Sequence, residues 1–210
     1  MIILDLKDET TDISRSDREI IAQLLKNDQV IVYPTDTLYG LGVDASSSQA
    51  VAHLYHLKGR KNMPVSVLLE SVAQLFELAY DLSNKAQVLI RKCLPGALTV
   101  ICKSQYPFAE QLVSDEGTIG FRVPGDAISC QIPALLGRPI TTTSANPAGS
   151  PAATSLKQIR DYFVDDIGLM LDVGALQPSK GSTVVDLTTK PFTILREGEI
   201  SRQTLHEFLN

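Results

Sequence analysis

Short apolar runs alternate with segments of helical periodicity along nearly the whole chain. Residues 30–33 form one such run, and it ends at Pro34, which has no N–H to donate to a sheet. Runs that are apolar on both faces are typical of strands buried in an α/β sheet. Because the alternation contains no internal repeats or low-complexity linkers, the sequence predicts one mixed α/β domain over residues 1–210.

The expected elements follow from periodicity and from turn residues. Ser16 and Glu19 fit a capping box at the start of the first helix. The segment 104–117 is a polar excursion, and 174–182 has the composition of a mobile loop over a site. Helices are expected at about 16–27, 47–58, 71–78, 83–92, 126–136, 155–163 and 202–208, and strands at about 30–33, 65–69, 98–102, 118–124, 139–143, 167–172, 183–187 and 192–196.

Composition narrows the class of protein. The 210 residues are 44% hydrophobic and carry a net charge of −5, which argues against a surface that grips nucleic acid as a whole. Cys93, Cys102 and Cys130 lack metal or redox spacing and read as core cysteines of a reducing compartment. The first residues lack the apolar core of a signal peptide, and no run approaches the roughly 20 apolar residues of a transmembrane helix. A cytoplasmic protein with no membrane partner is expected.

The segment 144–154 crowds hydroxyl and amide side chains, glycine and proline after the expected strand 139–143. Ser144 and Asn146, together with exposed backbone N–H groups, would suit a polar ligand. An isolated Ser-x-Asn is more often a capped turn. Thr35 and Thr37 after the strand 30–33, and Ser182 before the strand 183–187, make similar polar ends.

Two arginines stand where a charge is costly. Arg122 lies in an otherwise apolar strand, and Arg196 ends the last strand. An unpaired buried charge is very unfavourable, so each arginine is paired with a carboxylate or directed at a ligand. The alternative structural partners are Asp126 or another acid for Arg122, and Glu197 for Arg196.

Lys58 and Arg60 at the end of the expected helix 47–58 complete a set of four cations. Alone they would be a solvated helix end that complements the dipole. Together with Arg122, Arg196 and the hydroxyl groups they suit a polyanion such as a nucleoside triphosphate. The chain has no Walker motif and no histidine or cysteine placed as a nucleophile.

Metal ligation is weakly indicated. His53 and His56 are three residues apart but have no acidic or cysteine partner nearby, so a surface or packing role is expected. A Mg²⁺ ion held through water would suit several carboxylates, and no spacing distinguishes among Asp36, Asp44, Asp172 and Asp186.

Several of these segments, in order, resemble the blocks of the YrdC-like family. The resemblance covers about residues 12–200. The matching blocks are Tyr33-Pro34-Thr35-Asp36-Thr37-Leu38-Tyr39-Gly40-Leu41-Gly42, Lys58-x-Arg60, Leu94-Pro95-Gly96-Ala97-Leu98-Thr99, Phe121-Arg122-Val123-Pro124, Ser144-x-Asn146, Gly181-Ser182-Thr183-Val184-Val185-Asp186 and Leu195-Arg196-Glu197-Gly198.

The resemblance implies a single α/β domain, a twisted open mixed sheet flanked by helices, with a concave electropositive face. It implies synthesis of threonylcarbamoyl-adenylate and pyrophosphate from L-threonine, bicarbonate and ATP, with Mg²⁺ on the triphosphate. The product would serve tRNA modification, through direct tRNA binding or a threonylcarbamoyl-transferase complex. Such a step needs alignment and charge neutralisation rather than a protein nucleophile.

The resemblance also implies roles for individual residues. Lys58 and Arg60 would act on the phosphates as the catalytic pair. The nucleotide would contact Lys58, Arg60, Thr118, Ser144, Asn146, Thr154 and Arg196. Threonine would contact Thr35, Thr37, Arg122 and Ser182, and no protein ligand for the metal is assigned.

The segment after Arg60 departs from the family pattern. It is shorter by one residue and lacks a proline and a histidine that many relatives have, while Lys61 supplies a charge. A noncatalytic RNA-binding module and a carbamoyl-adenylate-forming enzyme are the alternatives. Salt-sensitive RNA affinity without ATP turnover would favour the first, and use of carbamoyl phosphate would favour the second.

Overall fold

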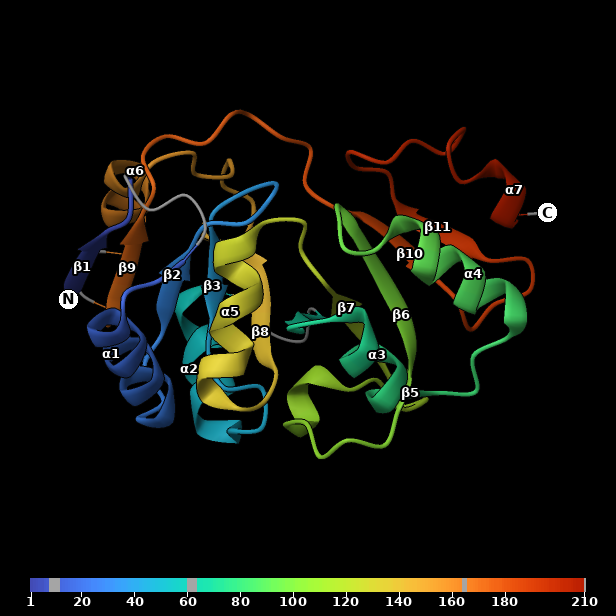
Figure 1. Ribbon diagram of the computed structural model, residues 1–210, viewed down its shortest axis with the longest axis horizontal. Coiled ribbons are helices and arrows are strands. Elements are labelled where there is room, and N and C mark those ends of the chain that lie inside the picture. Colours follow the sequence, from blue (N-terminus) through green and yellow to red (C-terminus); the bar gives the residue numbers. More distant parts are fainter. Residues whose placement is uncertain (8–11, 60–63, 164–165, 210) are drawn as a thin grey trace.

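A computed structural model describes residues 1–7, 12–59, 64–163 and 166–209. Within these residues an 11-stranded mixed sheet has the order β1-β9-β2-β3-β8-β4-β7-β6-β10-β11, with β5 beside β6. The sheet crosses the molecule from end to end, so the two termini lie at opposite ends of the view in Figure 1. The prediction of one mixed α/β sheet flanked by helices is confirmed.

The strands are short. They are β1 (Ile2–Asp5), β2 (Ile31–Tyr33), β3 (Gly40–Gly42), β4 (Ser66–Leu68), β5 (Ala79–Tyr80), β6 (Leu98–Ser104), β7 (Thr118–Arg122), β8 (Ile140–Ser144), β9 (Leu169–Asp172), β10 (Thr183–Asp186) and β11 (Thr193–Arg196). The helices are α1 (Arg15–Lys26), α2 (Ser48–Leu57), α3 (Val72–Leu78), α4 (Asn84–Cys93), the 3₁₀ turn η1 (Glu110–Leu112), α5 (Ala127–Leu136), α6 (Leu156–Tyr162) and α7 (His206–Leu209).

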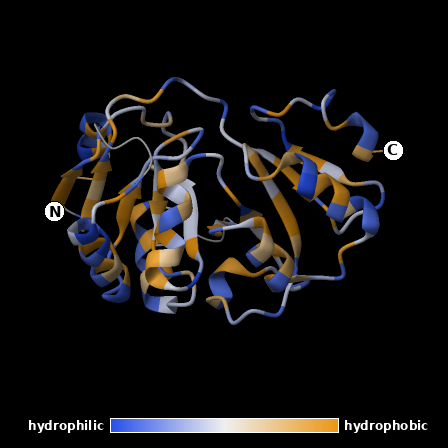
Figure 2. Ribbon diagram, viewed as in Figure 1, coloured by the Kyte–Doolittle hydropathy of each residue, from blue (hydrophilic) through white to orange (hydrophobic). Residues whose placement is uncertain are grey.

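Two apolar clusters cover the two faces of the sheet. Val30 and Val32 point to the larger cluster, whereas Ile31 and Tyr33 point to the smaller one. This alternation follows from the two-residue period of a strand. Helices α1 and α5 cover the second face, and the remaining helices pack on the first. Figure 2 shows the resulting pattern, with largely hydrophobic strands and helices in which hydrophilic and hydrophobic residues alternate along the ribbon.

Serine and aspartate cap most of the helices. The first helix is capped by Ser14, whose side chain accepts a hydrogen bond from the Asp17 N–H. The predicted capping box at Ser16 and Glu19 is therefore wrong, because the helix begins at Arg15 and Ser16 lies inside it. The other side-chain caps that accept from the helix backbone are Ser47, Ser71, Ser83, Asp126 and Ser155.

Most predicted elements are present with boundaries within two residues of the expected ones. Strands β1, β3 and β5 were not predicted. The segment expected to be a polar excursion contains η1, and α7 is shorter than the expected helix 202–208. Residues 173–182 have no helix or strand and run across the top of the view in Figure 1, from β9 to β10. No described helix is long and apolar enough to cross a membrane.

Candidate functional site

A cavity of about 310 Å³ lies on the sheet face that α1 and α5 cover only in part. The same strands supply both regions. Tyr33 and Ile140 pack in the small apolar cluster, while Thr35 and Thr142, two residues further along, line the cavity. Strand β8 therefore passes from a helix-covered core into a polar hollow without changing face, and the chain after β2 reaches the same hollow through the turn that follows Tyr33.

One row of side chains crosses four neighbouring strands and borders the cavity. Arg122 of β7 pairs with Thr99 of β6, Thr99 with Val184 of β10, and Val184 with Arg196 of β11. Partners in a ladder lie side by side and point to the same face. All four residues line the cavity. Two guanidinium groups that are distant in sequence thus belong to one site.

Gly120 makes room in the floor beside this row. A Cβ atom there would lie 2.5 Å from Ser66 Oγ and 3.4 Å from Thr99 Cγ2. Any side chain at position 120 would therefore displace Ser66 or Thr99, which lie close to the Gly120 backbone. The hollow depends on the glycine as well as on the polar residues around it.

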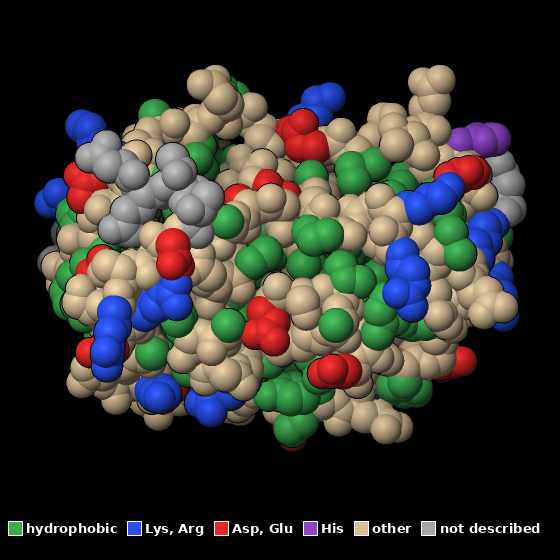
Figure 3. Space-filling model, in the orientation of Figure 1, with side chains coloured by type: hydrophobic (Ala, Val, Ile, Leu, Met, Phe, Trp, Pro, Cys, Tyr) green, Lys and Arg blue, Asp and Glu red, His purple; other side chains and the backbone are tan. Residues whose placement is uncertain are grey.

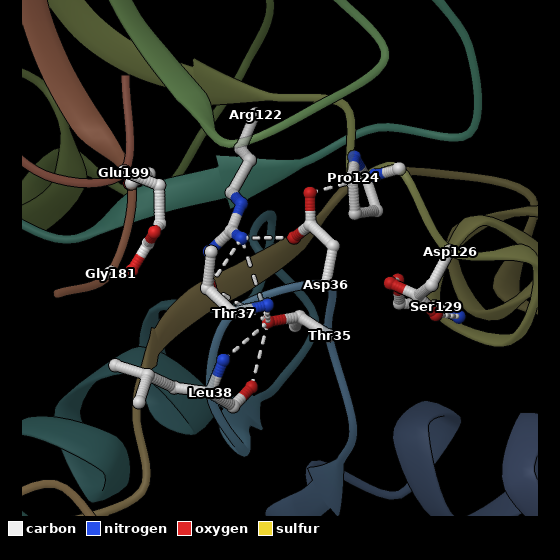
Figure 4. A network of polar contacts seen from close by, with 12 residues as sticks. Thr35, Asp36, Thr37, Leu38, Arg122, Pro124, Asp126, Ser129, Gly181 and Glu199 are labelled. Atoms are coloured by element: carbon white, nitrogen blue, oxygen red, sulfur yellow. Dashed lines mark hydrogen bonds and ion pairs between the residues drawn. The ribbon is translucent and has the colours of Figure 1, made fainter. Parts of the chain in front are cut away.

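Arg122 is buried, with 8% of its surface exposed. Its Nη2 forms an ion pair with Asp36 and donates to Thr37 Oγ1 at 2.6 Å (Figure 4). The expected ion pair with an acid is therefore present, but the acid is Asp36 and not Asp126, which caps α5 and accepts from the Ser129 N–H at 2.8 Å. The buried Nε of Arg122 has no hydrogen-bond partner among the described residues. An unused donor of a buried cation at a cavity suits an anionic ligand.

The turn after β2 is held by its own hydroxyl groups. Thr35 Oγ1 donates to the Leu38 carbonyl at 2.7 Å and accepts from the Thr37 and Leu38 N–H groups at 3.2 and 3.1 Å. Thr35 and Thr37 line the cavity as expected, but the Thr35 hydroxyl is committed to the turn. Thr37 Oγ1 accepts from Arg122 Nη2 at 2.6 Å, and Thr35 Oγ1 lies 3.5 Å from the same nitrogen.

Arg196 and Ser182 form the opposite side of the site. The Arg196 guanidinium donates to the Ser182 carbonyl at 2.9 Å and to Ser182 Oγ at 3.1 Å. Glu197 instead accepts from the Arg202 N–H at 3.2 Å. Arg196 as a whole is exposed, but partial desolvation of its guanidinium, followed by the positive charge of Arg122, lowers its pKa. An anion between the two arginines would relieve their mutual repulsion.

Lys58 is only 1% exposed, so it is not a solvated helix end. Its Nζ donates to the carbonyl groups of Ser144 and Asn146, the latter at 2.9 Å. Lys58 thus holds the 144–146 loop through two of its backbone carbonyls. Asn146 Nδ2 donates to the Ser150 carbonyl at 2.6 Å, while its buried Oδ1 has no partner among the described residues.

The structure brings together six of the predicted site residues at the cavity, namely Thr35, Thr37, Arg122, Ser144, Ser182 and Arg196. Lys58 and Asn146 are not among the described lining residues, and Lys58 Nζ joins them to the site through the Ser144 and Asn146 carbonyls. Thr118 and Thr154 are not among the residues that line the cavity: Thr118 bonds Ser114 at 2.8 Å, and Thr154 Oγ1 bonds Gln158 at 3.3 Å. Arg60 lies outside the described residues together with Lys61, Asn62 and Met63.

Each of the four carboxylates considered for Mg²⁺ contacts a different side chain or backbone group. Asp36 pairs with Arg122, Asp44 with Arg138, and Asp172 with Lys7, while Asp186 accepts from Thr188. In residues 1–7, 12–59, 64–163 and 166–209 no group of three or more His, Cys, Asp or Glu side chains is arranged to hold a metal. Neither His53 nor His56 belongs to such a group, and the three cysteines are free.

A second hollow of about 860 Å³ lies beside β5 and the β10–β11 turn, and none of the predicted site residues line it. Figure 3 shows one face of the molecule, where lysine and arginine side chains lie mainly toward the two ends and apolar side chains gather between them. The expected electropositive concave face stays a prediction. Among the residues that the structure describes, the cations that line the smaller cavity are Arg122, Lys180 and Arg196.

Comparison with known proteins shows to which family the chain is related. Residues 23–198 match the model of the Sua5/YciO/YrdC family, described as "Telomere recombination". The chain belongs to the Sua5/YciO/YrdC family. A putative threonylcarbamoyl-AMP synthase of Mycobacterium tuberculosis is 36% identical over 88% of this chain and 85% of its own length. A putative threonylcarbamoyl-AMP synthase of Methanocaldococcus jannaschii is 30% identical over 92% of this chain and 93% of its own length.

The fold of this Sua5/YciO/YrdC member matches solved relatives over its whole length. The Pyrococcus abyssi Sua5 structure complexed with L-threonine superposes with a TM-score of 0.91 at 28% identity. It covers 100% of this chain, which spans 61% of the Sua5 chain. The recognition of the family from its ordered motifs is therefore confirmed.

The sequence did not indicate several residues that build the cavity. Thr99, Ser66, Thr142, Gly120 and Lys180 line it, yet no role was assigned to any of them. Thr99 stands within a recognised family block, and its position as a hydroxyl residue inside the otherwise apolar run 98–102 was the signal available. Strand register decides which of these hydroxyls face the cavity.

Proposed function

We propose that this chain is a threonylcarbamoyl-AMP synthase, which joins L-threonine, bicarbonate and ATP into threonylcarbamoyl-adenylate and pyrophosphate. The observation that carries the proposal is Arg122, a buried guanidinium with an unused Nε at a cavity of about 310 Å³. The names of the relatives and the threonine complex of Sua5 support the choice of ligand.

Threonine would bind with its carboxylate against Arg122. Nη2 of the guanidinium donates to Thr37 and pairs with Asp36, which fixes its orientation and leaves Nε as a donor for the carboxylate. Ser182 adds a hydroxyl from the opposite wall. A fixed carboxylate would align the threonine amine, and the carbamate formed from it with bicarbonate, for attack on the α-phosphate.

The nucleotide would lie toward the 144–146 loop and Arg196. Lys58 sets the position of that loop through the Ser144 and Asn146 carbonyls, and the unpartnered Oδ1 of Asn146 suits a donor on the base or ribose. Arg60, Thr118 and Thr154 keep their expected nucleotide roles as part of this proposal. Transition-state charge on the phosphates would be neutralised by cations placed in advance.

Mg²⁺ would enter as the complex with ATP. The described carboxylates near the cavity do not form a dedicated metal site, and Mg²⁺ commonly keeps several waters and binds substrate phosphates. The ion would supply charge neutralisation on the triphosphate. The product would be consumed by threonylcarbamoyl transfer to tRNA, which this chain serves through direct tRNA contact or a transferase complex.

Pyrophosphate release by the purified protein tests the proposal. With MgATP, release should require both L-threonine and bicarbonate, and threonylcarbamoyl-adenylate should form in equal amount. Release supported by carbamoyl phosphate in their place would point to carbamoyl-adenylate formation. Salt-sensitive RNA binding without any ATP turnover would point to a noncatalytic module.

A further inference from the structure

Thr99 occupies the middle of the site although its hydroxyl has no assigned role. It lies in β6 between Arg122 of β7 and Val184 of β10. It is only 3% exposed and lines the cavity. Its Oγ1 lies 2.8 Å from Ser182 Oγ. The Thr99 hydroxyl can therefore influence a ligand in the cavity through its contact with the Ser182 hydroxyl.

The donor and acceptor pattern fixes the direction of this contact when an anion is bound. A guanidinium only donates, so Ser182 Oγ accepts from Arg196 Nη2 at 3.1 Å. A carboxylate only accepts, so an anion that contacts Ser182 requires the serine proton to point toward it. Ser182 then has no proton left for Thr99, and Thr99 must be the donor in their contact.

We infer that Thr99 is a positioning residue for the substrate, because its hydroxyl donates to Ser182 and turns the Ser182 proton toward the bound anion. The inference rests on the proposed function and adds a residue to its threonine-binding machinery. Thr99 and Arg196 together leave the Ser182 hydroxyl one favourable direction, into the cavity. Removal of the Thr99 hydroxyl would free Ser182 to rotate.

The Thr99→Val variant tests this, because valine keeps the shape of the side chain and removes only the hydroxyl. A neutral hydrogen bond contributes about 0.5–1.5 kcal/mol, so the KM for threonine should rise about 2- to 12-fold. The KM for ATP should stay unchanged. Calorimetric binding of L-threonine should weaken by the same factor, and Thr99→Ser should restore both values.

Thr141→Val is the matched control. Thr141 is a fully buried sheet threonine that accepts from the Val43 N–H at 3.0 Å and does not line the cavity. It should lower stability without changing the KM for threonine. If Thr99→Val behaves like Thr141→Val while the wild type turns over, Thr99 is merely structural and the inference is overturned. A wild type without threonine-dependent turnover would instead contradict the proposed function itself, and the inference with it.

Discussion

Replacement of Arg122 by lysine separates the ligand-binding role of this side chain from its structural role. Nη2 serves Asp36 and Thr37, while Nε has no described partner. A lysine ammonium can still pair with Asp36, but it lacks a second nitrogen in a rigid plane. Arg122→Lys should therefore keep the fold and lose the contact that we assign to the threonine carboxylate.

The magnitude follows from the type of hydrogen bond. A bond to a charged group contributes about 1.5–3 kcal/mol, which corresponds to roughly a 10- to 140-fold rise in the KM for threonine. Arg122→Ala differs because the Asp36 side chain, 16% exposed, would lose its cation. Breaking a buried pair in this way costs about 3–5 kcal/mol of folding stability.

Pyrophosphate release against threonine concentration, at saturating ATP and bicarbonate, measures the first effect, and urea unfolding measures the second. Arg138→Lys is the control, because Arg138 pairs with Asp44 away from the cavity, with Nε 2.7 Å from Oδ2. Its KM for threonine should equal that of the wild type. A folded Arg122→Lys enzyme with an unchanged threonine requirement would refute the carboxylate assignment.

Three further outcomes follow. Lys58→Met should lower the free energy of unfolding in urea by about 1.5–3 kcal/mol and reduce turnover, because the 144–146 loop loses its ammonium. Gly198→Ala should lower thermal stability and turnover together, because its Cβ would lie 2.2 Å from the Gly181 carbonyl oxygen; an unchanged melting temperature would contradict this. Burial, with the charge of Asp36, raises the pKa of Asp126 above 3.8, so stability falls as pH rises from that value toward the raised pKa. Asp126→Asn, which still caps α5, should therefore unfold at higher urea concentration near neutral pH and show no gain below pH 3.8.

Sequence patterns predicted the long elements well because apolar periodicity reports burial directly. They missed β3, whose Gly40–Gly42 run lacks the β-branched residues typical of strands, and β1, whose Ile2 and Ile3 are half exposed. The capping serine was misplaced because Ser14 and Ser16 both fit the local pattern, and only the backbone conformation distinguishes them.

The site was predictable where family motifs carry it and not where it depends on pairing between strands. Arg122, Ser182 and Arg196 were indicated by polar residues at strand ends. The Lys58 ammonium donates to backbone carbonyls, and Arg122 pairs with Asp36 rather than Asp126. Both contacts join residues that are far apart in the sequence. Local spacing does not contain that information.

The row from Arg122 through Thr99 and Val184 to Arg196 has a consequence for how this protein tolerates change. Its members are aligned by the ladders of four strands, so a slip of one residue in any strand would turn a side chain of the row to the opposite face. Insertions or deletions inside these strands should abolish function even where the apolar core adapts. The row that we propose for substrate binding therefore keeps its alignment only while these ladders stay paired.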